Sequence, residues 1–288
     1  MIEYWKILVL ALVQGAAELL PVSSSAHVIV AERLMDLDPG RPDMVFLLVM
    51  LHTGTMFAVL LYFWPRWRGL WLSGGAPAWH FLKMIVLATA LTGVVGFGLK
   101  VLLESVVLPR ATGASKAEIE HQFRNLPLIA AALFAAGLLI IAAGWRRGKG
   151  ETDVVSPRSA TWVGLVQGLC LPFRGFSRSG ATISTALFCG VGRQRAEDFS
   201  FALAVVLTPP VIAYSLYKLR KDQGLPSAAE LTQLLAPGLV GMLFSFVAGL
   251  VALKFLSAVL ERGRWAWFGY YCLAAAAAVF VAARFFGL

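Results

Sequence analysis

The chain of 288 residues has few charged side chains, which make up 14% of it, whereas hydrophobic residues make up 59%. Soluble domains carry about 25% charged residues, so this composition excludes a soluble globular protein. Cysteine is also scarce, and Cys170, Cys189 and Cys272 lie scattered in apolar runs without a paired spacing. That pattern argues against a disulfide framework or a zinc site. A basic leader with a cleavage site is lacking too, so we expect no cleaved signal peptide.

The formal net charge of +9 is spread along the chain. No basic run is interleaved with aromatic residues as in a soluble nucleic-acid-binding module, so we expect no nucleic-acid partner. Lys and Arg instead concentrate in alternate loops, as the positive-inside rule describes for cytoplasmic loops. These loops contain Arg66, Arg68, Arg146, Arg147, Lys149, Arg158, Arg193, Arg195, Arg262 and Arg264, whereas Lys218, Arg220 and Lys221 count against the bias. The pattern predicts that both termini lie on the outer side of the membrane.

Six apolar runs are long enough to cross a bilayer, because a spanning helix needs about 20 such residues. They cover residues 44–63, 80–102, 123–146, 199–217, 233–257 and 265–287. Two further apolar regions, 4–34 and 161–192, are interrupted by Pro, Ser and Gly. Broken segments at membrane depth must be buried in protein or line a wet cavity. The sequence therefore predicts an all-α polytopic membrane protein, one domain of six transmembrane helices and two re-entrant helical hairpins.

The two broken regions match each other at a spacing of 153 residues. The stretch LVQGAAELLPVSSSA (12–26), aligned without a gap to LVQGLCLPFRGFSRS (165–179), is identical at its first four positions and at Ser24 with Ser177. Three spans follow each region, and this odd number would give the second copy the opposite orientation. We therefore expect an inverted-topology repeat of residues 1–150 and 151–288, with ligand sites near the midplane.

The first hairpin carries a set of polar side chains that are unusual inside a membrane. Gln14 and Glu18 are four residues apart and so share one helix face, and Pro21 predicts the end of that half-helix just before it. The serines that follow can cap the returning half-helix, and His27 lies one turn after Ser24. A serine-rich cap with a hydrogen-bonded histidine is the structural alternative. Function is favoured because ionisable residues within membranes are functional by default.

The second hairpin contains RGFSRSGATIS, residues 174–184. Ser177, Ser179 and Thr182 offer hydroxyl groups, and Arg178 offers a planar, permanently charged donor that suits phosphate oxygens. Backbone amides at the start of the following half-helix would point at the same place. The sequence thus predicts an anion site in this hairpin.

Together the two hairpins predict phosphoryl-transfer chemistry, which depends mainly on positioning and charge stabilisation. Glu18 and Gln14 can hold a hard divalent cation, Mg²⁺ or Ca²⁺, beside ligand phosphates. Ser24 beside His27 can supply an activated nucleophile. An ion pair of Arg178 with Glu18 that only joins the repeats is the alternative interpretation. A site between membrane helices implies that the rest of the substrate is lipid.

These motifs resemble the two signatures of the undecaprenyl-diphosphate phosphatases of bacteria, also called bacitracin-resistance proteins. The matching positions are Gln14, Glu18, residues 21–24 and His27 for the first signature and residues 174–182 for the second. The likeness extends over the whole chain in length and order of spans. Two positions depart from the family pattern, because Arg174 replaces a proline and Ala26 replaces a common glycine.

The resemblance implies removal of the terminal phosphate from a C55 polyprenyl diphosphate at the outer face of the bacterial inner membrane. This reaction recycles the lipid carrier for peptidoglycan synthesis and confers bacitracin resistance. The implied roles are nucleophile for Ser24, acid/base partner for His27, metal-associated pair for Glu18 with Gln14, and diphosphate binding for Ser177, Arg178, Ser179 and Thr182. Attack by His27, or directly by water, stays open.

A transporter or flippase of polyprenyl phosphate is the main alternative, since secondary transporters commonly have inverted repeats and broken helices. Transport does not require a serine and a histidine beside Glu18. A structural scaffold would have no use for Arg178 at membrane depth. His52 and Thr53 could face the same cavity, although packing is slightly favoured, and Pro209-Pro210 predicts a kink. The oligomeric state, including a homodimer, is left open.

Overall fold

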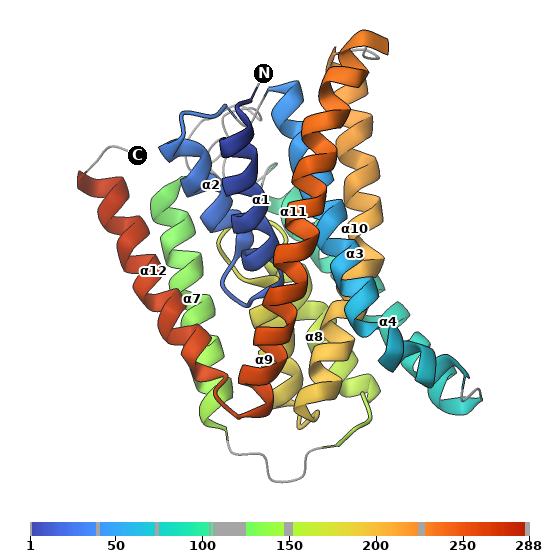
Figure 1. Ribbon diagram of the computed structural model, residues 1–288. Coiled ribbons are helices and arrows are strands. Elements are labelled where there is room, and N and C mark those ends of the chain that lie inside the picture. Colours follow the sequence, from blue (N-terminus) through green and yellow to red (C-terminus); the bar gives the residue numbers. More distant parts are fainter. Residues whose placement is uncertain are drawn as a thin grey trace.

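The computed structural model describes residues 2–38, 41–72, 75–103, 105, 125–146, 152–223 and 228–285 (Figure 1). Within these ranges the chain is helical, and the only β-type pairing is an isolated bridge between Thr152 and Val191. The helices are α1 (Tyr4–Leu19), α2 (Ser24–Leu34), α3 (Pro42–Leu72), α4 (Ala76–Leu102), α7 (Leu126–Trp145), α8 (Pro157–Cys170), α9 (Arg178–Phe188), α10 (Arg193–Gln223), α11 (Ala228–Glu261) and α12 (Ala266–Phe285).

Six helices are long and apolar enough to cross a membrane, which confirms the predicted number of spans. They are α3, α4, α7, α10, α11 and α12. Several extend beyond the apolar runs of the sequence, because a helix keeps its backbone hydrogen bonds outside the lipid core as well. Helix α10 continues through Pro209 and Pro210 to Gln223. Residues 123–124 and 286–287 of the predicted spans, and Arg147 and Lys149, lie outside the described residues.

Each interrupted region forms a pair of short helices joined by a turn. The helices contain 16 and 11 residues in the first pair and 14 and 11 in the second, fewer than the roughly 20 that a span needs. Figure 1 shows the α1–α2 pair in the upper half of the bundle and the α8–α9 pair in the lower half, with their turns near mid-height. This arrangement is compatible with the predicted re-entrant hairpins and inverted repeat.

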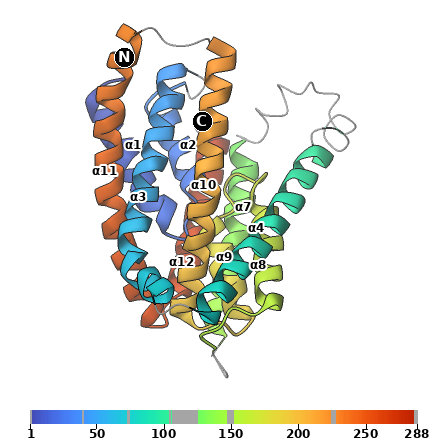
Figure 2. The ribbon, with the colours of Figure 1, turned by 90° about the vertical axis from the view of Figure 1, so that its right-hand side faces the viewer.

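The contacts between helices follow a matching pattern in the two halves of the chain. Helix α1 packs on α11, which is the second span after the other hairpin, and α8 packs in the same way on α4. The third spans of the two halves, α7 and α12, pack on each other. Figure 2 shows α4 and α8 side by side at the opposite flank of the molecule from α1 and α11. Each hairpin therefore packs against a span of the other half of the chain, and both turns lie in the middle of the bundle.

Glycines make the close approach of the hairpin helices possible. A Cβ atom at Gly15 would lie 2.6 Å from the carbonyl oxygen of Ser245, and one at Gly168 would lie 2.7 Å from Cβ of Val95. Gly15 and Gly168 are matching positions of the two copies. Lipid tails are as apolar as the side chains of the helices, so the hydrophobic effect does not drive helices together within a membrane. Association depends instead on close packing, which small residues allow.

Candidate active site

Glu18 lies at the centre of a polar cluster built from both hairpins. Its Oε2 accepts hydrogen bonds from the Ser24 hydroxyl at 2.6 Å and from Nε2 of Gln14 at 3.2 Å. Its Oε1 accepts one from Nη2 of Arg178, also at 3.2 Å. The side chains of Glu18 and Arg178 are 18% and 21% exposed. The structure thus brings together four of the residues that the sequence selected, from α1, α2 and α9.

The guanidinium of Arg178 is only partly satisfied. Its Nη1 is buried, and among the described residues it has no hydrogen-bond partner. A buried donor without an acceptor costs about 1–3 kcal/mol, and more when it is charged, and arginine cannot lose its proton to avoid that cost. A phosphate oxygen is the acceptor that suits this donor best. Within the described ranges, the unpaired Nη1 is thus a donor in the cluster that still requires an acceptor.

The start of α9 holds Arg178 in place through hydroxyl groups. Ser177 is the N-cap residue, and its hydroxyl accepts a hydrogen bond from the amide of Gly180 at 3.2 Å. The hydroxyl of Thr182 donates to the carbonyl of Arg178 at 2.9 Å and pairs with that of Ser200 at 2.6 Å. Two hydroxyls predicted to bind the diphosphate thus have partners within the protein, where they stabilise the first turn of α9.

Two further hydrogen bonds join the turn of one hairpin to the turn of the other. The hydroxyl of Ser179 donates to the carbonyl of Leu20 at 3.2 Å, and the amide of Gly175 donates to the hydroxyl of Ser25 at 3.1 Å. Gly175 has φ +99°, and a Cβ there would meet the carbonyl oxygen of Ile129 at 2.5 Å. Only glycine fits this position, which explains its place in the motif.

His27 points away from the carboxylate. Its Nδ1 lies 2.8 Å from the carbonyl oxygen of Ser23, so this nitrogen carries the proton, and its Nε2 accepts from the hydroxyl of Tyr271 at 2.7 Å. The hydroxyl of Ser24 donates to Glu18 instead. A hydrogen bond between Ser24 and His27 is therefore not part of the described structure. Tyr271, on α12, carried no signal in the sequence because it lies 244 residues from its partner.

The sequence slightly favours a packing role for His52 of α3, but the structure places this residue beside Glu18. Its Nε2 lies 3.9 Å from Oε2 of Glu18, while its Nδ1 lies 2.7 Å from the carbonyl oxygen of Leu48. The neighbouring Thr53 bonds only along its own helix, to the carbonyl of Val49. The signal that could have identified His52 is its location within a span, where ionisable residues are rarely structural.

Comparison with known proteins identifies the family of the chain. The family model described as Bacitracin resistance protein BacA matches residues 7–278. The chain belongs to this family. It is 56% identical over 275 residues to undecaprenyl-diphosphatase 2 of Acinetobacter baylyi, covering 93% of this chain and 94% of that protein. It is 29% identical over 275 residues to the undecaprenyl-diphosphatase of Bdellovibrio bacteriovorus, covering 93% and 92%. The resemblance seen in the two motifs is confirmed.

The side chains around Glu18 can be compared with the ligands that a divalent cation requires in a protein. Glu18 offers a carboxylate, and Gln14, which is 1% exposed, offers an amide that would present its oxygen after a flip. No cluster of three or more His, Cys, Asp or Glu side chains occurs in the described part of the chain. Mg²⁺ is usually bound by one or two carboxylates together with substrate phosphates and water. The residues thus fit a cation that is shared with a phosphate ligand.

Proposed function

We propose that this chain hydrolyses undecaprenyl diphosphate to undecaprenyl phosphate and inorganic phosphate. The observation that carries the proposal is that Nη1 of Arg178 is buried without a hydrogen-bond partner in the described part of the protein, while Nη2 is bonded to Glu18. Glu18 also accepts a hydrogen bond from the hydroxyl of Ser24. Arg178, which can bind an anion, and Ser24, whose hydroxyl can be activated, are thus both hydrogen-bonded to Glu18. The names of the relatives support the substrate. The product re-enters peptidoglycan synthesis, and its steady supply confers resistance to bacitracin.

In the proposed reaction, Ser24 is the nucleophile. Oε2 of Glu18, at 2.6 Å, takes the hydroxyl proton while Oγ of Ser24 forms a bond to the terminal phosphorus. The bond from that phosphorus to the bridging oxygen breaks, and undecaprenyl phosphate leaves. Water then attacks the phosphorus of the phosphoserine, the bond from phosphorus to Oγ breaks as Glu18 returns its proton to Oγ, and the water oxygen leaves as part of inorganic phosphate. Arg178 neutralises the charge that develops on the phosphate oxygens. Direct attack by water is the alternative.

The remaining residues of the predicted site support these steps. His27, the predicted acid/base partner, is bonded to Ser23 and Tyr271, so in this proposal Glu18 takes the proton of Ser24. Ser177, Ser179 and Thr182 bind the diphosphate or hold the turn that carries Arg178. Oxygens of Glu18 and Gln14 would hold Mg²⁺ or Ca²⁺ together with the phosphates. That cation would supply additional neutralisation of phosphate charge.

We further propose that the chain lies in the bacterial inner membrane, with its site opening to the periplasmic face. The alternation of basic loops supports this orientation. Figure 1 shows that the start of α1 and the end of α12 lie at the same end of the bundle, where the α1–α2 pair enters. The chain forms one domain of two inverted repeats, residues 1–150 and 151–288, and a homodimer remains to be tested.

Phosphate release from a polyprenyl diphosphate by the detergent-purified protein tests the function. We expect Arg178→Ala to lower kcat by about 10²–10³, the usual effect of removing a transition-state donor, and Ser24→Ala, which removes the nucleophile, to lower it by about 10⁴–10⁶. A chelator should lower the wild-type rate, and added Mg²⁺ or Ca²⁺ should restore it. The matched control is Ser215→Ala, because that hydroxyl bonds only to the carbonyl of Val211 on its own helix.

Full activity in both variants would overturn the site assignment. Absence of phosphate release by the wild type, combined with movement of polyprenyl phosphate between leaflets of proteoliposomes, would favour the transporter instead.

A further inference from the structure

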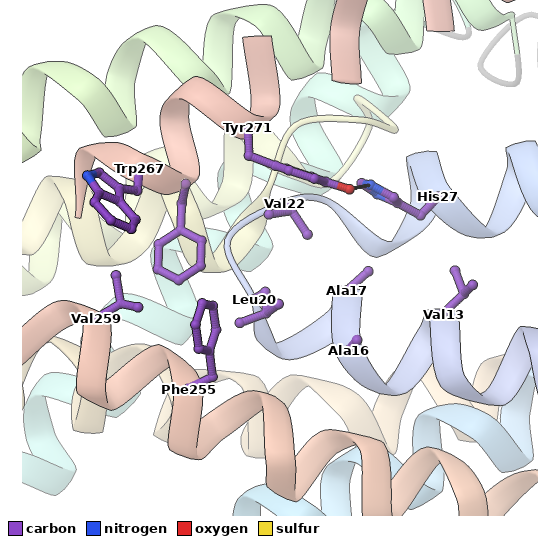
Figure 3. Close-up of a pocket in the computed structure, with 11 residues that line it drawn as sticks. Val13, Ala16, Ala17, Leu20, Val22, His27, Phe255, Val259, Trp267 and Tyr271 are labelled. Atoms are coloured by element: carbon purple, nitrogen blue, oxygen red, sulfur yellow. Dashed lines mark hydrogen bonds between the residues drawn. The ribbon is translucent and has the colours of Figure 1, made fainter. Parts of the chain in front are cut away.

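An apolar pocket of about 410 Å³ lies on the side of α1 that faces α11 and α12 (Figure 3). Pockets for small organic ligands commonly have about 300–1,000 Å³, so this one has room for part of a chain-like molecule. Its lining comes from α1, the turn that follows, α2, α11 and α12. His27, Tyr271 and Trp267 are the lining residues whose side chains contain polar atoms, and the other lining side chains are aliphatic or aromatic hydrocarbons.

Helix α1 separates this pocket from the polar cluster. Gln14 and Glu18 lie on the face that carries the cluster, whereas Val13, Ala16 and Ala17 line the pocket. The three lining positions follow the helical spacing of i, i+3 and i+4, which places them on one face. Two of them are alanines, and their small side chains leave the space that the pocket occupies. A single turn of α1 thus serves both the polar cluster and the apolar pocket.

Part of the pocket lining is exposed on the surface of the spans α11 and α12. Phe255 of α11 and Trp267 and Tyr271 of α12 line the pocket, and each is about half exposed. All three lie on helices that are candidate spans or at the first turn of one. Their exposed parts therefore face the lipid, and a chain in the bilayer can enter between α1, α11 and α12 without crossing water. Figure 3 shows the phenylalanine and tryptophan rings at one end of the pocket and His27 at the other.

The His27–Tyr271 pair connects the pocket to the reaction site. The two rings are stacked at a centroid distance of 5.7 Å, and Tyr271 donates to Nε2 of His27. The other ring nitrogen donates to the carbonyl of Ser23, the residue that precedes Ser24. The pair thus links the polar end of the pocket to the backbone of Ser23, which precedes the residue whose hydroxyl is bonded to Glu18. The apolar pocket and the polar cluster on the other face of α1 suit a molecule that has an apolar chain and a polar head.

We propose that the pocket holds the isoprenoid units nearest the diphosphate, with the phosphates beside Arg178 and Ser24. This inference rests on the proposed hydrolysis of a polyprenyl diphosphate. Lipid tails are as apolar as the lining, so burial of the chain supplies little driving force. The pocket acts by position, because it fixes the chain relative to the hairpin turn and so orients the terminal phosphorus toward Oγ. Accurate orientation of this kind has a large effect on rates.

Substrates that differ only in their chain test the proposal. We would compare kcat/KM for farnesyl diphosphate with that for methyl diphosphate, which carries the same phosphates without an isoprenoid chain. Ala16→Phe fills the pocket and should lower the ratio of the two values about tenfold. Ala277→Phe is the matched control, because Ala277 is exposed on α12 and does not line the pocket. It should leave the ratio at the wild-type value. A wild-type ratio in Ala16→Phe would overturn the proposal.

Photolabelling tests the pocket without relying on hydrolysis. A farnesyl diphosphate analogue with a diazirine in its second isoprenoid unit should label Phe255 and Tyr271 in the detergent-purified protein. Labelling there should fall about tenfold in Ala16→Phe and stay constant in Ala277→Phe. Labels confined to residues outside the pocket lining would overturn the proposal, as would equal labelling by a diazirine phospholipid. If this pocket is labelled but the wild type releases no phosphate, the chain site stands and the proposed reaction fails.

Discussion

Nε2 of His52 faces Oε2 of Glu18 at 3.9 Å, and the opposite ring nitrogen, Nδ1, lies 2.7 Å from the carbonyl oxygen of Leu48. The contact with Leu48 holds the imidazole ring beside the carboxylate oxygen that also accepts the hydroxyl of Ser24. His52 is therefore a positioning residue for the carboxylate. We expect His52→Ala to lower kcat about 10- to 100-fold, as for other residues that orient a metal ligand.

The role of His52 can be separated from simple packing by comparing catalysis with stability. His52→Gln keeps a polar side chain of similar reach but loses the imidazole that lies beside Oε2 of Glu18. This variant should lower kcat while KM and the melting temperature in detergent stay near the wild-type values, and Thr53→Val should keep all three. A wild-type kcat in His52→Gln would mean that His52 has a packing role only.

The ion pair of Glu18 with Arg178 contributes to the stability of the protein as well as to its proposed activity. Glu18→Gln removes the charge that balances a partly buried guanidinium, and breaking a buried pair costs about 3–5 kcal/mol. Because the pair is about one-fifth exposed, we expect a loss at the lower end of that range. The double variant with Arg178→Gln should recover most of the thermal stability in detergent but none of the activity. Recovery of activity in the double variant would contradict a catalytic role for either residue.

A second charged cluster lies between α3 and α10. Nη1 of Arg66 lies 3.1 Å from Oε2 of Glu197 and 3.2 Å from Oδ1 of Asp198. Both carboxylates are almost fully buried, so Arg66→Met would leave two charges without their shared partner. We expect a destabilisation of about 3–5 kcal/mol, measured by thermal unfolding in detergent. Arg68→Met, at an exposed position two residues away, should change stability by less than about 0.5 kcal/mol. Equal melting temperatures for the two variants would show that the cluster is not structural.

The close contact at Gly15 predicts a steric effect on the position of α1. A side chain there would meet backbone atoms of α11, with the Ser245 oxygen 2.6 Å from the new Cβ. Gly15→Leu should force α1 outward, with an overpacking cost of about 1–3 kcal/mol and a loss of activity through displacement of Glu18. Gly93→Leu is the control, because a Cβ at that position has no atom within 4 Å. Wild-type activity in Gly15→Leu would show that α1 can move without moving the site.

Much of this architecture could be predicted from the sequence because the physical signals are local. Pro21 predicts the end of a half-helix, and α1 ends at Leu19. Ser177 precedes a helix with the chemistry of an N-cap, and it forms that cap. The convergence of Glu18 with Arg178 could be predicted because the two residues lie near the breaks of the two copies, and the broken segments of an inverted repeat meet near the midplane.

The orientation of His27 could not be predicted in the same way. Helical periodicity places it one turn after Ser24, but side-chain direction depends on Tyr271, which comes from the far end of the chain. Periodicity likewise does not say which face of α3 is turned toward Glu18, so His52 could not be separated from a packing residue. The sequence predicts that the hydroxyls of Ser177 and Thr182 bind the diphosphate, because it does not reveal internal partners such as Ser200.

The pairing of Glu18 with Arg178 also has a consequence for how the protein is made. The two residues are 160 positions apart, so the ribosome completes the first hairpin and three spans before the guanidinium exists. An unpaired carboxylate is costly within the bilayer. We therefore expect the α1–α2 pair to remain at the membrane surface during synthesis and to settle at its final depth only when the α8–α9 pair arrives from the opposite side.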